Sequence, residues 1–143
     1  MSPPLRTQQD LDALWKGLEA GEIQIVATDH CPFNYAKEKQ DGKDDFRKCP
    51  NGAPGVEERM ILLFSEGVMK NKISINKLVE VACTNPAKVY GMYPKKGIIE
   101  PGADGDLVII DADAKQTLTH EMMHGAVDYT SYCLLYTSDA ADD

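Results

Sequence analysis

The sequence lacks the features that mark membrane, secreted and nucleic-acid-binding proteins. No apolar run reaches the roughly 18 residues that predict a membrane-spanning helix. Met1–Arg6 has no apolar core of a secretory signal. Basic residues are few, with 15 Lys and Arg against 23 Asp and Glu, so the net charge is −8 and a polyanion would be repelled. We therefore expect neither a membrane nor a nucleic acid as a partner.

The sequence also has no CxxC pair. Its four cysteines, Cys31, Cys49, Cys83 and Cys133, are widely spaced, which argues against a structural zinc knuckle. Unpaired cysteines in a chain without a signal are typical of a reducing compartment. We therefore expect a cytoplasmic protein.

The N-terminal part has the pattern of a helix followed by a strand. Thr7–Asp10 resembles a capping box, and apolar residues then recur at helical spacing as far as Leu18. Gly21 supplies a helix stop. Ile23–Thr28 is short and rich in β-branched residues, which predicts a buried strand. A helix leading into such a strand is half of an α/β repeat.

A long polar segment, residues 30–55, follows this strand and is typical of a functional loop or a disordered one. Periodic apolar residues then predict a helix over Val56–Lys70 and a second helix capped by Ser74. Asn85 and Pro86 predict the start of a short third helix, which Gly91 would close.

The helical period ends near residues 92–96, where we place a domain boundary between residues 1–91 and 92–132. Gly97–Ile99 and Leu107–Asp111 read as strands on either side of a Pro-Gly turn, and Lys115–Thr119 also resembles a strand. Residues 133–143 do not continue this pattern. They resemble the in-frame translation of a transposon-type sequencing adapter, and the alternative is a genuine acidic tail.

Asp29 directly follows the predicted strand Ile23–Thr28. In parallel α/β folds, above all in (β/α)₈ barrels, the carboxyl ends of strands face the active site. A carboxylate there can bind a metal ion and accept a proton from a bound water. From pattern alone, a turn residue or helix cap is the commoner role. We do not expect His30 or Cys31 to be further ligands, because neighbouring side chains on an extended chain alternate in direction.

Seven motifs occur in the order found in one enzyme family. They are Met1–Arg6, Thr28–Asn34, Gly42–Phe46, Pro50–Gly52, Val56–Met60, Thr84–Lys88 and Gly102–Ile109. Each motif is loose alone, but the ordered set resembles the dihydropyrimidinase and D-hydantoinase family of metal-dependent cyclic amidohydrolases, over residues 1–132. The resemblance implies an α/β fold: the C-terminal part of a (β/α)₈ TIM barrel over residues 1–91, followed by part of a small β-sandwich domain.

The resemblance also implies a function for the intact protein. A hydroxide held between two divalent metal ions, most commonly zinc, would open a 5,6-dihydropyrimidine or hydantoin ring to an N-carbamoyl amino acid. Asp29 matches the aspartate that binds one metal and moves the proton, while Ser2 and Asn51 match residues that bind the imide edge, largely through main-chain groups. The other ligands, a carboxylated lysine among them, would lie upstream. The family is commonly homotetrameric, and we expect this C-terminal fragment alone to be inactive and poorly soluble.

Two alternatives compete with this interpretation. His120–His124 is a formal HExxH, which on a helix could hold zinc with Glu121 as the general base of a protease. No long helical pattern surrounds it, and no third ligand follows. The second alternative is a non-catalytic scaffold resembling the collapsin-response-mediator proteins. At the imide-binding position those proteins have a residue other than asparagine. This sequence has Asn51 there, as the enzymes do, which favours the enzyme over the scaffold.

Overall fold

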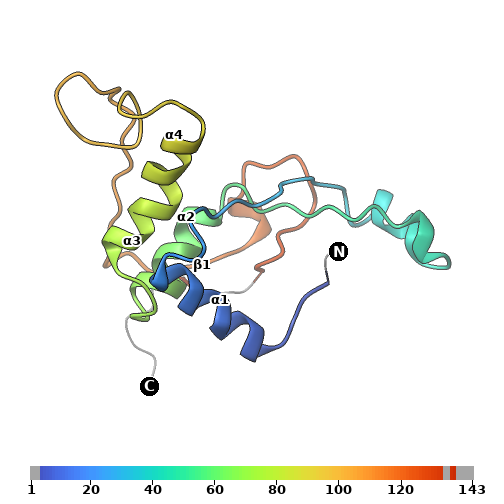
Figure 1. The fold of residues 1–143 in the computed structure, drawn as a ribbon. Coiled ribbons are helices and arrows are strands. Elements are labelled where there is room, and N and C mark those ends of the chain that lie inside the picture. Colours follow the sequence, from blue (N-terminus) through green and yellow to red (C-terminus); the bar gives the residue numbers. More distant parts are fainter. Residues whose placement is uncertain (1–3, 134–135, 138–143) are drawn as a thin grey trace.

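A computed structural model describes residues 4–133 and 136–137; helices form a small core from which long irregular segments extend (Figure 1). Labels with η denote short 3₁₀ or π turns. In chain order the elements are α1 (Gln8–Ala20), η1 (Glu38–Gly42), η2 (Phe46–Lys48), α2 (Arg59–Leu62), η3 (Leu63–Val68), α3 (Ile75–Val79), η4 (Glu80–Thr84), α4 (Asn85–Val89), β1 (Gln116–Thr117), η5 (His120–Met122) and β2 (Tyr136–Thr137).

The first helix, α1, begins and ends where its sequence predicts. The Thr7 hydroxyl accepts a hydrogen bond from the Asp10 backbone N–H, and the Asp10 carboxylate accepts one from the Thr7 N–H at 3.0 Å. This reciprocal pair is the predicted capping box. It provides acceptors for two N–H groups that have no hydrogen-bond partner within the helix. Gly21 ends the helix in the left-handed conformation, with φ 80°.

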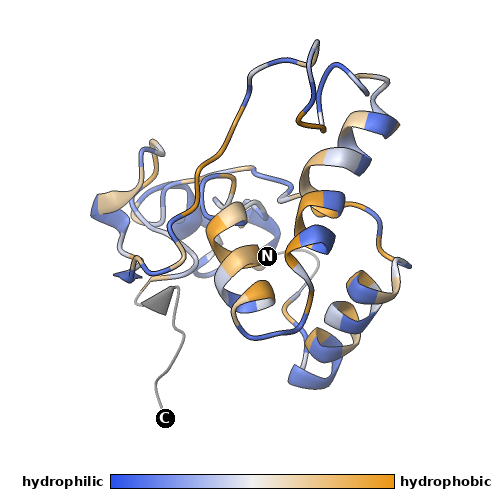
Figure 2. Ribbon diagram, turned by 90° about the vertical axis from the view of Figure 1, so that its left-hand side faces the viewer, coloured by the Kyte–Doolittle hydropathy of each residue, from blue (hydrophilic) through white to orange (hydrophobic). Residues whose placement is uncertain are grey.

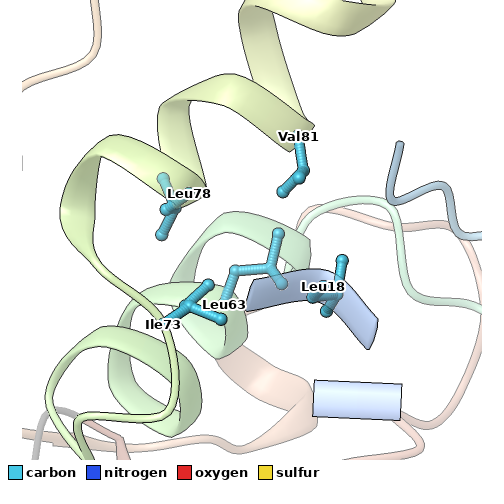
Figure 3. Close-up of a cluster of buried hydrophobic side chains, with 5 residues drawn as sticks. All are labelled: Leu18, Leu63, Ile73, Leu78 and Val81. Atoms are coloured by element: carbon cyan, nitrogen blue, oxygen red, sulfur yellow. The ribbon is translucent and has the colours of Figure 1, made fainter. Parts of the chain in front are cut away.

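A cluster of buried aliphatic side chains joins the helices. Its members are Leu18, Leu63, Ile73, Leu78 and Val81, which meet between α1, η3 and the α3–η4 helix (Figure 3). Full burial of such a side chain contributes about 1.5–3 kcal/mol. This cluster is the main source of hydrophobic stabilisation in the described part of the chain, and it lies to one side of the long polar loop.

The helix predicted over Val56–Lys70 is present from Arg59 to Val68, as α2 and η3. Ser74 caps the next helix as predicted, with its hydroxyl accepting from the Lys77 N–H at 3.0 Å. The short helix predicted from Asn85 is present as α4, with Pro86 in its first turn, and it continues directly from α3 and η4. The π turn η4 lets Asn85 donate to the Glu80 carbonyl, and this wider turn accommodates Pro86, which has no N–H.

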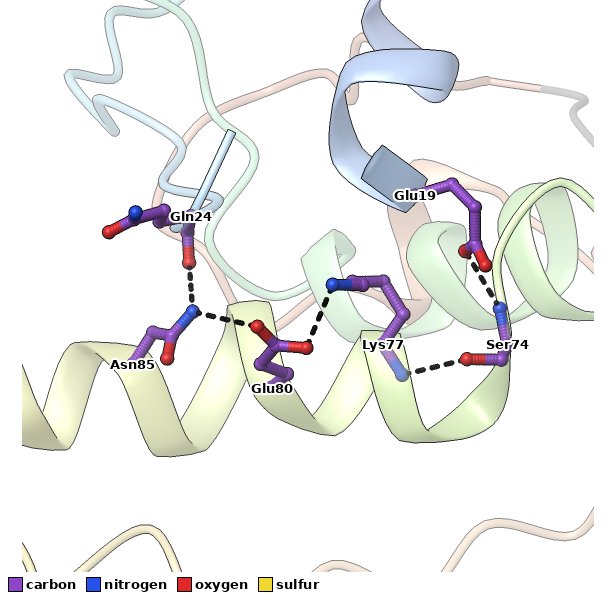
Figure 4. A network of polar contacts seen from close by, with 6 residues as sticks. All are labelled: Glu19, Gln24, Ser74, Lys77, Glu80 and Asn85. Carbon is purple, nitrogen blue, oxygen red and sulfur yellow. Dashed lines mark hydrogen bonds and ion pairs between the residues drawn. The ribbon is translucent and has the colours of Figure 1, made fainter. Parts of the chain in front are cut away.

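Polar side chains tie this long helix to α1 and to the chain that follows α1 (Figure 4). Glu19 accepts a hydrogen bond from the Ser74 N–H at 3.3 Å. The Asn85 amide donates to the Gln24 carbonyl at 2.9 Å, and the Val26 N–H donates to the Val81 carbonyl at 3.2 Å. The segment after α1 is therefore held against helices.

The strand predicted over Ile23–Thr28 is wrong for the described chain. The segment is irregular and only half buried, and its neighbourhood contains a single parallel bridge between His30 and Ala53. A strand requires a ladder of hydrogen bonds to a neighbouring strand. No such neighbour is present within residues 4–133.

The strands predicted over Gly97–Ile99 and Leu107–Asp111 are also absent. The apolar run Leu107–Ile110 lies on irregular chain, which is coloured orange in Figure 2. Within this run, Ile109 is 97% exposed. The strand predicted over Lys115–Thr119 is confirmed in part, because β1 lies within it and pairs antiparallel with β2.

The four cysteines all lie in the described residues and are unpaired. Among those residues, no helix is both long and apolar enough to cross a membrane.

Candidate functional site

Asp29 occupies a special point of the backbone. It has φ 48°, the left-handed region that few residues other than glycine adopt and that Asp and Asn adopt most readily. Its side chain is exposed, and among the described residues it accepts no hydrogen bond. The turn therefore presents a free carboxylate at the point where the predicted strand gives way to the polar loop.

His30, the next residue, bonds to the end of the loop through one ring nitrogen. Its Nδ1 accepts hydrogen bonds from the backbone N–H groups of Gly55 at 3.2 Å and Val56 at 3.3 Å. An accepting Nδ1 places the ring proton on Nε2, a tautomer assigned from these contacts. Both Nδ1 partners are main-chain groups, so His30 serves to hold the start of the loop against its end.

The loop that carries Asn51 lies beside the segment that carries Asp29. The Cys31 N–H donates to the Ala53 carbonyl at 3.2 Å, next to the parallel bridge. Gly52 lies so close to Cys31 that a Cβ added to the glycine would be 1.9 Å from the Cys31 carbonyl oxygen. The fold thus brings together the Asp29 and Asn51 segments, with Asn51 exposed. Ser2, the third predicted site residue, lies outside the described residues.

Lys39 holds the carbonyls on both sides of Asn51. Its ammonium donates to the Pro50 and Gly52 carbonyl oxygens, each at 2.5 Å. The lysine lies within the first loop turn, η1, and its Nζ is 5.6 Å from the centroid of the Phe33 ring. Sequence reasoning missed this residue, because nothing in the pattern distinguishes it from the other lysines of the loop.

Asp128 anchors the start of the same loop from far along the chain. Its carboxylate accepts hydrogen bonds from the backbone N–H groups of Tyr35 at 2.6 Å and Ala36 at 2.9 Å. Both bonds lower the pKa of Asp128, and the bond from Ala36 has the larger effect. Tyr129 adds an edge-on contact to the Tyr35 ring, with centroids 6.1 Å apart. Residues 128–129 therefore join the C-terminal segment to the candidate site.

A cleft of about 230 Å³ lies beside His30. It is lined by His30, Pro54, Gly55, Val56, Glu57, Glu58, His120, Met123, His124, Gly125, Val127 and Tyr129. The carboxylate of Glu58, a lining residue, accepts a hydrogen bond from the Thr130 hydroxyl at 2.6 Å, and both residues are buried. Two further lining residues also meet: the Glu57 carboxylate accepts from the His124 N–H at 2.9 Å and contacts Nδ1 of the same residue at 2.7 Å.

The HExxH motif does not form the helix that a zinc protease requires. The helical part of the motif is the single 3₁₀ turn η5, which covers His120–Met122. The next residue, Met123, is extended, with φ −83° and ψ 144°. The two histidines therefore do not share a helical face. The hydrogen bond to Glu57 raises the pKa of His124, as does the charge of that carboxylate. Among the described residues, no group of three or more His, Cys, Asp and Glu side chains is arranged to hold a metal ion.

Comparison with known proteins connects this arrangement to one family. The model of the Amidohydrolase family matches residues 3–132. D-phenylhydantoinase of Escherichia coli O1:K1 / APEC is 49% identical over 132 residues, which are 92% of this chain and 29% of the relative. The structure of dihydropyrimidinase from Brevibacillus agri NCHU1002 matches with a TM-score of 0.93 and 46% identity, over 95% of this chain and 30% of that one.

A further solved structure extends the likeness. The L-hydantoinase (dihydropyrimidinase) from Arthrobacter aurescens matches with a TM-score of 0.87 and 33% identity, over 96% of this chain and 30% of that one. The chain thus spans less than a third of the length of these relatives. The resemblance drawn from the seven motifs is confirmed, and the chain belongs to the amidohydrolase family.

Proposed function

We propose that the protein to which this chain belongs hydrolyses a cyclic amide, opening a 5,6-dihydropyrimidine or hydantoin ring to an N-carbamoyl amino acid. The relatives and solved structures described above carry the names of such enzymes. The observation that carries the proposal is the contact between the Asp29 and Asn51 segments, made by the His30–Ala53 bridge and the approach of Gly52 to Cys31. This contact places a free carboxylate near an exposed backbone turn.

The proposal assigns Ile23–Thr28 to the last strand of a (β/α)₈ barrel, within a barrel part that covers residues 1–91. Residues 92–132 then belong to a small β-sandwich domain. Two observations suit segments that pair with strands elsewhere in the intact protein: Ile23–Thr28 makes no strand ladder within the described chain, and the apolar run Leu107–Ile110 is exposed. Both segments have strand-forming composition without a partner strand. Segments of the intact protein outside this chain would supply those partners.

Asp29 would provide one ligand of a centre of two divalent ions, most simply zinc. Such ions polarise the ring carbonyl and lower the pKa of the attacking water. The exposed, unpartnered Asp29 carboxylate fits a ligand role, and its proton-accepting oxygens suit it to transfer a proton to the leaving ring nitrogen. One carboxylate cannot hold two ions, so this chain alone should be inactive.

Asn51 would bind the imide edge of the substrate through its main chain, together with Ser2. A cyclic ureide presents alternating carbonyl and N–H groups, which exposed backbone donors and acceptors can match. The proposal also places the intact protein in the cytoplasm as a homotetramer, in keeping with the family resemblance and the unpaired cysteines.

A hybrid enzyme tests the proposal. In it, residues 1–132 of this chain replace the matching segment of the E. coli D-phenylhydantoinase. Ring opening of hydantoin and dihydrouracil is followed by loss of ring absorbance, and bound metal is measured by elemental analysis. We expect an active, metal-loaded hybrid. Asp29→Asn should reduce turnover by roughly 100-fold or more and lower the metal content, while Asp44→Asn, in the exposed loop, should leave both unchanged.

Two results would count against the proposal. One is a folded, metal-loaded hybrid without activity. The other is an Asp29→Asn hybrid that keeps both its metal and its turnover. A folded hybrid that binds no metal would instead favour the scaffold interpretation, because Asp29 would then not act as a metal ligand.

A further inference from the structure

We propose that Lys39 is a positioning residue for substrate binding, which orients the backbone N–H of Asn51 toward the substrate. The inference rests on the proposed function. Its basis is the pair of hydrogen bonds from the Lys39 ammonium to the carbonyls of Pro50 and Gly52, which flank Asn51 in the sequence. An ammonium has three donors and no acceptor, so two of its donors are committed to this loop.

The bond to Pro50 decides where the Asn51 N–H points. The Pro50 carbonyl and the Asn51 N–H belong to one planar peptide group, and that peptide is trans. In a trans peptide the C=O and N–H directions are opposed. Holding the Pro50 oxygen toward Lys39 therefore turns the Asn51 N–H away from it. That N–H donates no backbone hydrogen bond within the described residues, so it is available to a ligand.

The bond to Gly52 fixes the other end of the same turn. Gly52 is held between the Lys39 ammonium and the backbone of Cys31, where no Cβ could fit. Cys31 is separated from Asp29 only by His30, whose ring is itself tied to the backbone of Gly55. Lys39 and Cys31 thus fix Asn51 relative to the proposed metal ligand.

Lys39 is itself held in place by the first part of the loop. Its backbone N–H donates to the Asn34 carbonyl at 3.1 Å, and the Gln40 side chain donates to the Tyr35 carbonyl at 2.6 Å. Tyr35 in turn donates to Asp128. A lysine on such a supported turn loses less freedom when it binds two carbonyls than one on a free loop. Asp128 therefore supports the Asn51 turn indirectly, through Lys39.

Substitution of Lys39 tests the inference in the hybrid enzyme. Lys39→Met keeps the length of the side chain and removes the donors, and we expect KM to rise roughly tenfold with kcat changed much less, because a binding contact is lost. Lys39→Arg keeps two donors and should restore most of the KM. Lys37→Met is the matched control: this exposed lysine of the same loop makes no side-chain hydrogen bond within the described residues, and its KM should not change.

Hydrogen exchange on the folded hybrid enzyme gives a readout that does not depend on activity. Lys39→Met should increase exchange of the Cys31 amide, which donates to the Ala53 carbonyl at the end of this turn, and Lys37→Met should not. An active hybrid whose KM does not respond to Lys39→Met, or responds equally to Lys37→Met, overturns the role of Lys39. An inactive unsubstituted hybrid counts against the proposed function instead, and unchanged exchange of the Cys31 amide in Lys39→Met then overturns the loop geometry itself.

Discussion

Gly52 lies directly against the backbone of Cys31, closer than any residue with a side chain could. A Cβ on Gly52 would be 1.9 Å from the Cys31 carbonyl oxygen and 2.6 Å from the Cys31 Cβ. The glycine is required here by space, because the two segments meet at backbone distance. Through this contact the end of the polar loop is joined to the segment that follows Asp29.

Gly52→Ala should separate these two segments. The added methyl must displace backbone atoms, which costs about 1–3 kcal/mol in a packed contact. We expect a lower free energy of unfolding in urea and faster amide exchange at Cys31. Gly105→Ala is the control, because a Cβ at Gly105 would meet nothing within 4 Å. Equal stability of the two variants would show that the contact is not formed in solution.

Leu78→Ala should destabilise the helical core. Leu78 is 1% exposed and belongs to the central aliphatic cluster. Removal of its side chain leaves a cavity, and such a change costs about 2–5 kcal/mol. The measurement is the urea midpoint by circular dichroism. Ile75→Ala in the same helix removes a side chain that is 46% exposed, so it should cost much less. A larger effect from Ile75 would contradict the packing described.

The Glu57–His124 contact should depend on pH. Glu57 raises the pKa of His124 above its ordinary value of 6.5, through a hydrogen bond first and charge second. A raised folded pKa means that the protonated histidine contributes stability below about pH 6.5, which is lost as pH rises through the folded value. The His124 bond lowers the pKa of Glu57 from 4.5, so this contribution is lost as pH falls through that lower value.

An NMR titration of the histidine rings measures this coupling. The His124 midpoint should lie above 6.5 in the unsubstituted chain and return toward that value in Glu57→Gln. Glu66→Gln is the control, since Glu66 pairs with Lys70 instead. A His124 midpoint that is the same in all three proteins would mean that the contact with Glu57 does not form.

Asp128→Asn should loosen the beginning of the polar loop. The carboxylate accepts from two backbone N–H groups, and an amide can offer only one oxygen to them. We expect faster exchange of the Tyr35 and Ala36 amides. In Asp44→Asn, which changes an exposed aspartate of the same loop, exchange at these two amides should be unaffected. Full protection of both amides in Asp128→Asn would rule out Asp128 as the anchor.

The candidate site was only partly predictable. The family motifs predict Asp29 and Asn51 as site residues, but they carry no information on how the two segments meet. Lys39 and Asp128 were missed as site residues because their partners are backbone groups. Every residue offers such groups, so a lysine that binds carbonyls or an aspartate that binds N–H groups leaves no distinctive pattern in the sequence.

The sequence by itself determined the features that depend on a few neighbouring residues. The capping box at Thr7, the stop at Gly21 and the cap at Ser74 all satisfy helix ends locally, and all three are present. The tertiary structure alone decided whether Ile23–Thr28 and Leu107–Asp111 become strands. A helix forms its hydrogen bonds between residues four apart, whereas a strand forms them with another segment. The composition of a segment does not reveal whether a partner strand is present.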